Sequence, residues 1–168
     1  MIDPRANNPQ PLTAPAPLPV VSRRALRRVK DALPIPSSCN CCGGARVELI
    51  ENSEIYNGRS YGEWPYAYLC RDCGAYVGLH PATDLPLGTL ADKPLREARN
   101  RGKRPFERIW RERYMRRSEA YAWLAKQLQL PDEQCHFGLF DAEQCEQARQ
   151  ASEAFLAEAA PQLRAQSL

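Results

Sequence analysis

Two short cysteine motifs are the residues of this sequence best suited to chemistry. The first is Cys39-Asn-Cys-Cys42-Gly and the second is Cys70-Arg-Asp-Cys73-Gly. Each motif places two thiols three positions apart and follows them with a glycine, so a turn can wrap around a metal and direct backbone amides at the sulfurs. A tetrahedral zinc ion takes four such thiolates at roughly 2.3 Å. The motifs therefore predict one structural zinc, bound by Cys39, Cys42, Cys70 and Cys73.

Two further observations concern the predicted zinc site: the spacing between the motifs, and the number of cysteines in the chain. The 27 residues between Cys42 and Cys70 exceed the roughly 15–20 of the commonest pattern, which implies a long hairpin or an inserted loop. Two disulfides or free core cysteines are the alternatives, but doubled motifs of this kind rarely arise without a metal. Seven cysteines without an export signal favour the reducing cytoplasm, where cysteines bind metal or lie in cores.

Five further residues could be mistaken for metal ligands. Using Cys41 would leave one residue between neighbouring ligands and would shift the motif glycine, so we expect that it is not a ligand. His80 follows the second motif closely, but four cysteines are already available, and a hydrogen-bonding role in a loop is favoured. Cys135, His136 and Cys145 offer a second site, although two buried thiols and a satisfied histidine explain them better.

The elements expected around the cysteines form a zinc ribbon over residues 37–88. Residues 46–50 alternate as a strand does, and residues 65–69 lead into the second motif as its partner. A third strand is expected over residues 75–78.

The loop between the first two strands is rich in aromatic residues. It contains Tyr56, Arg59, Tyr61 and Trp64. Aromatic rings interleaved with an arginine stack on nucleobases or anchor a protein interface. A third interpretation, that the rings cover the small ribbon core, stays open.

The N-terminal region divides into two parts. Residues 1–20 hold six prolines and few large apolar residues, which predicts a disordered tail. Residues 21–34 predict a basic amphipathic helix with Val21, Ala25, Val29 and Leu33 on its apolar face. Its outer face carries Arg23, Arg24, Arg27 and Arg28. That face could contact the phosphate backbone of a nucleic acid or lie on an anionic membrane surface. Alternatively, the helix caps the domain and this face is simply exposed to solvent.

Residues 89–160 predict a helical domain, followed by a flexible C-terminus over residues 161–168. Helices are expected at 92–103, from Pro105 to Tyr114, at 119–129 with Ser118 as the cap, and from Asp141 onward with Gln144 completing a capping box. Gly102 and Pro105 are expected to separate the first two helices.

Charge is unevenly distributed along the chain. The net charge is only +3, yet residues 92–117 carry 11 basic and 4 acidic side chains, and residues 118–168 carry 3 basic and 8 acidic ones. The basic segment includes Arg96, Arg99, Arg101, Lys103 and Arg104. Such blocks predict a cationic face suited to phosphates, unless the acidic C-terminal helix folds over it.

Several motifs, read together, resemble a known family. They include Cys39-Asn-Cys-Cys-Gly-Gly44, Asn52-Ser-Glu-Ile-Tyr-Asn-Gly-Arg-Ser-Tyr-Gly62, Trp64-Pro-Tyr-Ala-Tyr-Leu-Cys70 and Ser118-Glu-Ala-Tyr-Ala-Trp-Leu-Ala125. The family is the zinc-finger-containing domain-of-unknown-function family of phages, prophages and bacteria, and the resemblance covers about residues 39–148. It implies zinc at the four cysteines and a phage or mobile-element context, but no activity. Position 41 departs from the family, in which an aromatic or polar residue is more usual.

The sequence therefore predicts an α+β protein, a zinc ribbon followed by helices, without a membrane span or membrane partner. The favoured function is non-enzymatic binding of DNA or RNA through the basic face and the aromatic loop. The alternative is a protein-binding module that targets a host polymerase, nuclease or defence complex. A nucleic-acid-processing enzyme is least favoured, because the chain has only two histidines and four cysteine ligands leave zinc no open position.

Overall fold

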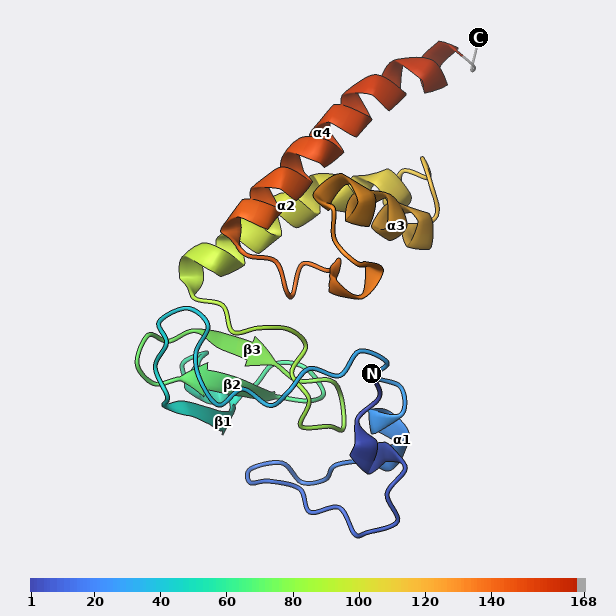
Figure 1. Cartoon of the computed structure of the whole chain (residues 1–168). Helices are drawn as coiled ribbons and strands as arrows, with labels where there is room; N and C mark the ends of the chain where they lie inside the picture. Colours follow the sequence, from blue (N-terminus) through green and yellow to red (C-terminus); the bar gives the residue numbers. More distant parts are fainter. Residues whose placement is uncertain (166–168) are drawn as a thin grey trace. The chain divides into compact units, whose positions relative to one another are not determined.

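The computed structural model describes residues 1–165, with side chains through residue 159, and divides the chain into two compact units. The first unit is Met1–Asp92, and the second begins at Lys93 (Figure 1). The first contains a three-stranded antiparallel sheet and the second contains helices, so the predicted α+β class is confirmed. None of the helices in the described part of the chain is long and apolar enough to cross a membrane.

The sheet of the first unit is built from β1 (Val47–Glu51), β2 (Tyr66–Cys70) and β3 (Tyr76–Gly78), in that order. All three predicted strands are confirmed, with small shifts at their ends. In the register, Val47 lies opposite Cys70 and Tyr68 lies opposite Val77. Because opposed residues share a face, Tyr68, Cys70 and Val77 point to the same side and are buried in the core of this unit.

The N-terminal segment differs from the disordered tail predicted for residues 1–20. It contains a 3₁₀ turn, η1 (Pro4–Ala6), and both Ala6 and Leu18 are buried in the same core as Tyr68. The prediction was wrong because it considered only the segment's own apolar content. The inner face of the sheet supplies the surface that these few residues cover, and the fixed φ of the prolines reduces the entropy lost on ordering.

The predicted basic helix over residues 21–34 is also much shorter than expected. The helix α1 spans Arg23–Leu26, capped by the Ser22 hydroxyl, and is followed by a tighter turn in which the Val29 amide donates to the Leu26 carbonyl at 3.2 Å. Val21, Leu26 and Val29 are buried. Leu26 packs in the same buried cluster as Tyr68, so tertiary packing rather than a long helical stripe holds this segment.

The second unit consists of α2 (Lys93–Arg111), α3 (Arg117–Leu128), a 3₁₀ turn η3 (Asp132–Gln134) and α4 (Ala142–Ala165). Helices α2 and α4 pack along each other, as Figure 1 shows. The hydrophobic core of the second unit includes Phe106, Ile109, Leu124, Phe140 and Ala148, each almost fully buried.

Helix α2 is continuous, whereas an interruption was predicted at Gly102 and Pro105. Gly102 is buried against α4, where an added Cβ would lie 2.5 Å from the Cys145 carbonyl oxygen. The glycine therefore lets the two helices approach closely rather than ending one of them. The buried stripe of Ala98, Phe106 and Ile109 stabilises α2 across Pro105.

The helix starts agree with the predictions only in part. Helix α3 is capped at Arg116 rather than Ser118, because the Arg116 amide donates to the Glu119 carboxylate at 2.9 Å. The capping box of Asp141 and Gln144 is confirmed, with reciprocal bonds of 3.0 and 2.8 Å. Helix α4 continues over residues 161–165 of the C-terminus that was predicted to be flexible, and residues 166–168 lie outside the described part.

Candidate metal centre

The four predicted ligands form one cluster. The Sγ atoms of Cys39, Cys42, Cys70 and Cys73 all lie within 4.8 Å of one another. The Cys39–Cys73 and Cys42–Cys70 sulfur pairs are each 3.6 Å apart. Tetrahedral zinc with bonds of roughly 2.3 Å requires about 3.8 Å between sulfurs, so the cluster fits a single zinc ion.

The two motifs fold in the same way, which accounts for their equivalent ligands. The Gly43 amide donates to the Cys39 carbonyl at 2.8 Å, and the Gly74 amide donates to the Cys70 carbonyl at 2.9 Å. Both glycines have a positive φ, 74° and 75°, which favours glycine over any other residue. The repeated turn brings the two thiols of each motif to one side of the loop.

Backbone amides and the neighbouring thiols prepare the sulfurs for a cation. The Cys41 amide donates to Cys39 Sγ at 3.4 Å, and the Gly44 amide donates to Cys42 Sγ at 3.3 Å. Burial alone would raise the pKa of Cys39, but the backbone amides of Cys42 and Cys41 and the thiols of Cys73 and Cys70 lower it to about 7. Four thiolates this close repel one another, so the charge of Zn²⁺ is what allows all four to ionise together.

Secondary structure and ion pairs hold the two motifs in position. Cys70 ends β2, and both Cys39 and Cys70 are buried, whereas Cys42 and Cys73 are exposed. An ion pair joins Arg46, which directly precedes β1, to Asp72 of the second motif. The zinc therefore closes the end of the sheet.

The other candidate ligands lie elsewhere. Cys41 Sγ lies 3.5 Å from the Leu90 carbonyl and is not in the cluster, which agrees with the prediction for Cys41. The backbone of His80 is bound within its loop, and burial lowers the pKa of its imidazole. Cys135 and Cys145 are buried. Among the described residues, the four-cysteine cluster is the one group that could hold a metal.

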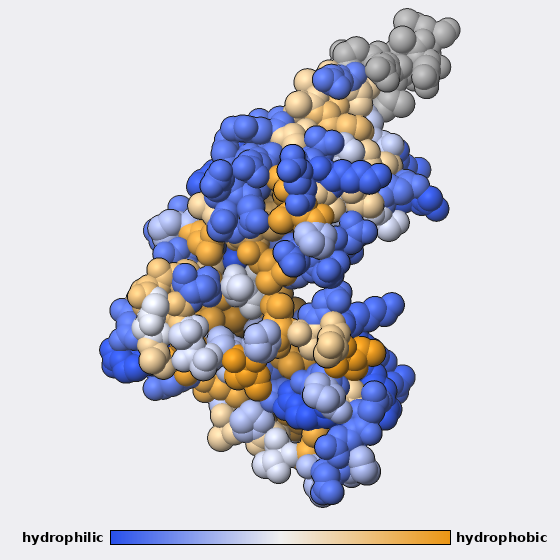
Figure 2. Space-filling view, in the orientation of Figure 1, coloured by the Kyte–Doolittle hydropathy of each residue, from blue (hydrophilic) through white to orange (hydrophobic). Residues whose placement is uncertain are grey.

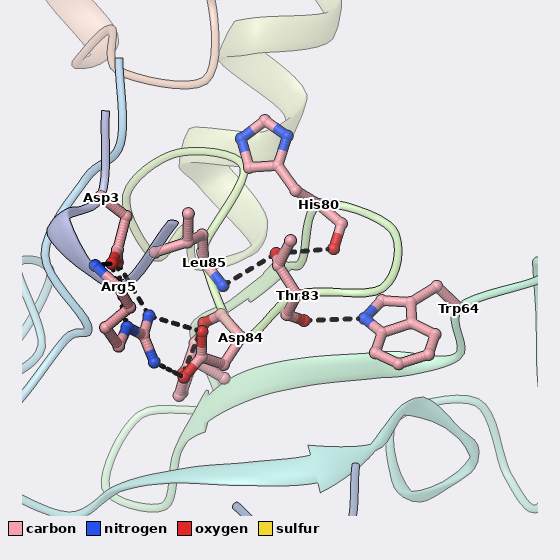
Figure 3. A network of polar contacts seen from close by, with 8 residues as sticks. Asp3, Arg5, Trp64, His80, Thr83, Asp84 and Leu85 are labelled. Atoms are coloured by element: carbon pink, nitrogen blue, oxygen red, sulfur yellow. Dashed lines mark hydrogen bonds and ion pairs between the residues drawn. The ribbon is translucent and has the colours of Figure 1, made fainter. Parts of the chain in front are cut away.

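The sequence analysis missed a polar network that joins the N-terminal segment to the loop after β3 (Figure 3). Arg5 donates to both carboxylate oxygens of Asp84, at 2.7 and 2.8 Å, and Asp84 is only 2% exposed. Asp3 also accepts from Arg5. The Tyr68 hydroxyl donates to the Asp84 carbonyl at 2.7 Å. No local pattern could have indicated this network, because its members lie far apart in the chain.

The predicted aromatic residues divide into two groups. The rings of Tyr56 and Tyr61 meet edge to face at 4.9 Å, and Tyr61 is 54% exposed. Arg59 is exposed in the same loop. Trp64, in contrast, is half-buried and donates its indole N–H to the Thr83 carbonyl at 3.0 Å (Figure 3). Trp64 therefore has a structural role, whereas Tyr56, Arg59 and Tyr61 are exposed.

The basic residues in α1 and just after it also divide into two groups. Arg23 donates to the backbone carbonyls of Asn8 and Gln10, so it holds the N-terminal segment. Arg24, Arg27 and Arg28 are exposed.

The basic residues of α2 lie in different environments. Arg96 is half-buried, and Arg99 donates to the Phe140 carbonyl at 3.0 Å. Lys103 pairs with Glu107. Arg101 and Arg104 are exposed and form no ion pair within the part of the chain whose side chains are described.

Comparison with known proteins shows to which family the chain belongs. No curated protein matches the chain, and no solved structure does. A family model described as a zinc-finger-containing domain matches residues 35–154, which is more than half of the chain and includes all four cysteines. This match confirms the resemblance noted from the sequence, and the geometry of the cluster agrees with it. The chain belongs to the zinc-finger-containing domain family of unknown function and carries one structural zinc site.

Proposed function

We propose that this protein binds nucleic acid and is not an enzyme. The zinc ribbon is a scaffold, and the outer face of α2 contacts phosphates. A phage or mobile-element setting, which the family resemblance implies, belongs to the same proposal. The observation that carries it is a row of four arginines on α2.

The row consists of Arg101, Arg104, Arg108 and Arg111, which we call the arginine row. All four are exposed, and their spacing of three or four positions puts them on one side of the helix. At 1.5 Å per residue they follow one another at about 4.5–6 Å along the axis. A regular line of guanidinium groups is suited to successive phosphates of one strand.

The acidic residues of the second unit whose side chains are described pair with only half of this row. Arg108 and Arg111 pair with Glu112 and Glu107, but these are exposed pairs within one helix, worth about 0.3–0.5 kcal/mol, and a phosphate can replace them. On α4, Arg149 holds Glu146 and Glu153 at 2.6 Å each. Part of the acidic charge of α4 is thus neutralised within that helix.

Exposed hydrophilic and basic side chains elsewhere on the protein also support nucleic-acid binding. Figure 2 shows hydrophilic side chains over much of the outer surface of the helical unit in this view. Exposed arginines also occur in the first unit, at Arg24, Arg27 and Arg28, and the loop between β1 and β2 presents Tyr61 and Arg59. These groups add phosphate contacts and a ring for stacking.

A binding titration tests the proposal. Fluorescence anisotropy with labelled single-stranded and duplex oligonucleotides should show binding at about 50 mM salt, and log affinity should fall with log salt at a slope of roughly −3 to −5. Arg104→Glu should weaken binding and flatten the slope. Lys126→Glu makes the same charge change at an exposed site on α3 and should have little effect. If the protein binds neither the single-stranded nor the duplex oligonucleotide, the proposal is overturned.

A protein partner is the second candidate, because one observation favours it. Tyr56, Tyr61 and Leu87 are large, exposed side chains, 37%, 54% and 48% accessible. Tyr56 contacts Tyr76 of β3, and Leu87 binds the backbone of Gly78 on the same strand, so these side chains gather beside one strand. If Tyr61→Ala abolishes copurification of a specific protein while the wild type binds no nucleic acid, this alternative replaces the first.

A further inference from the structure

A hollow lies at the turn between α2 and α3, entirely within the second unit. Trp110, Arg113, Met115, Arg116 and Glu119 line it, and its volume is about 370 Å³. This volume falls near the lower end of ligand sites, roughly 300–1,000 Å³. The hollow is therefore large enough for a small ligand but not for a folded partner.

The charges around the hollow favour an anion. Arg116 is paired with Glu119 at the start of α3, where the amides of a 12-residue helix present partial positive charge. Arg113 is exposed and forms no ion pair with any side chain that the structure describes. The one acidic residue of the lining is thus already neutralised, and a guanidinium remains for the ligand.

The wall of the hollow is aromatic and apolar. The guanidiniums of Arg111 and Arg117 lie over the Trp110 ring, 5.3 and 5.4 Å from its centroid. The indole N–H of Trp110 is buried and has no hydrogen-bond partner among the described residues, which costs about 1–3 kcal/mol. An arginine that turns from the ring toward a ligand phosphate would uncover the ring.

We infer that this hollow binds one unpaired nucleotide of a nucleic-acid strand. The Arg113 guanidinium binds its phosphate, and its base packs against Trp110 and Met115. The inference rests on the proposed function and deepens it, since it adds a preference for single strands. A duplex cannot offer the site a free base without the cost of unpairing.

The position of the hollow supports this assignment. Arg108 and Arg111 lead along α2 toward its C-terminal end, and Arg113 follows in the turn. A strand whose phosphates follow the arginine row would therefore reach the hollow at the end of the helix. Stacking on an aromatic ring is tolerant of sequence, so the site should accept any base.

The test uses AMP as the probe and the full zinc-loaded chain. Arg113 has a positive φ of 63°, so Arg113→Gly removes the guanidinium at a position where glycine is well suited to the backbone. Gln129→Gly is the matched control, because Gln129 has a φ of 54° at the other end of α3. Isothermal titration calorimetry should show that AMP binds the wild type and Gln129→Gly equally, and Arg113→Gly about tenfold more weakly.

Further titrations separate this inference from the proposed function. Adenosine and inorganic phosphate should each bind more weakly than AMP, since each supplies half of the ligand, and a single-stranded hexanucleotide should bind more tightly than a blunt duplex of equal length. If oligonucleotides bind but AMP does not, or if Arg113→Gly binds AMP as the wild type does, the inference is overturned while the proposed function stands. If AMP binds as described and no oligonucleotide binds, the hollow is a mononucleotide site and the proposed function fails.

Discussion

The guanidinium of Arg5 holds the buried carboxylate of Asp84 through two hydrogen bonds, although 79 positions separate the two residues. The pair fastens the N-terminal segment to the loop that follows β3. Because Asp84 is buried, its charge depends on Arg5 for compensation. The N-terminal segment is thereby a structural part of the zinc-binding unit.

Removing this guanidinium should destabilise the first unit. Breaking a buried ion pair costs about 3–5 kcal/mol, but the Arg5 side chain is 33% exposed, so we expect that Arg5→Ala lowers the free energy of unfolding by about 2–3 kcal/mol. Arg28→Ala, an exposed arginine in the same segment, should change it by less than about 0.5 kcal/mol. Urea titration of both variants measures the difference, and equal midpoints would contradict the role assigned to Arg5.

The same network predicts a pH dependence. Hydrogen bonds from Arg5 lower the pKa of Asp3 below its ordinary value. A carboxyl whose pKa is depressed on folding stabilises the protein above its unfolded pKa, near 4, and that contribution is lost as the pH falls through the folded value. The difference in stability between the wild type and Asp3→Asn should therefore shrink below about pH 4, as unfolding titrations at pH 7 and pH 3 would show.

The zinc site predicts opposite outcomes for a ligand, Cys70, and a cysteine outside the cluster, Cys41. A structural zinc is worth on the order of 10 kcal/mol, comparable to the stability of a small domain, so Cys70→Ser should lose the metal and unfold the ribbon. Cys41→Ala should keep one zinc per chain. Elemental analysis and circular dichroism report both results. Loss of zinc in Cys41→Ala, with retention in Cys42→Ala, would reverse the ligand assignment.

The close approach of α2 and α4 makes Gly102 a sensitive position. In Gly102→Ala the new methyl would lie 2.5 Å from a backbone oxygen of α4, which must shift. The expected loss is about 2–3 kcal/mol, despite the better helix propensity of alanine. Asn100→Ala, on the exposed side of the same helix, should be neutral or slightly stabilising. Thermal unfolding followed by circular dichroism compares the two.

Two thiols of the second unit should be inert. Burial raises the pKa of Cys135 and of Cys145 to about 11. At pH 8 about one thiol in a thousand is then ionised, so iodoacetamide should leave both unmodified in the folded protein and modify them in denaturant. Since these pKa values are raised on folding, stability should decline as the pH rises from about 8.5 toward 11. Rapid native-state labelling of either cysteine would contradict their burial, and mass spectrometry of the peptides detects it.

The sequence predicted the parts of the molecule that depend on local chemistry. The four ligands, the three strands and the capping box of Asp141 follow from spacing and residue type within short segments. The α+β class follows from the same patterns.

The errors share one physical cause, which is long-range packing. Residues 1–20 have too few apolar residues to form a core of their own, and only the sheet formed by residues 47–78 supplies one. Gly102 and Pro105 indicated a break in the helix, but the contact with α4 requires a residue without a side chain. The hollow at the α2–α3 turn also had no sequence signal, because it arises from the way Trp110 and Arg113 meet in space.

The buried N-terminal segment has a consequence for synthesis. Leu18 and Leu26 leave the ribosome before the strands that cover them, and roughly 50 residues separate Leu26 from Val77. At about 5–20 residues per second, these leucines stay without their partners for about 3–10 s. Both motifs must also emerge before zinc can be bound, so the nascent chain should be most exposed to proteases and chaperones until residue 84 is complete.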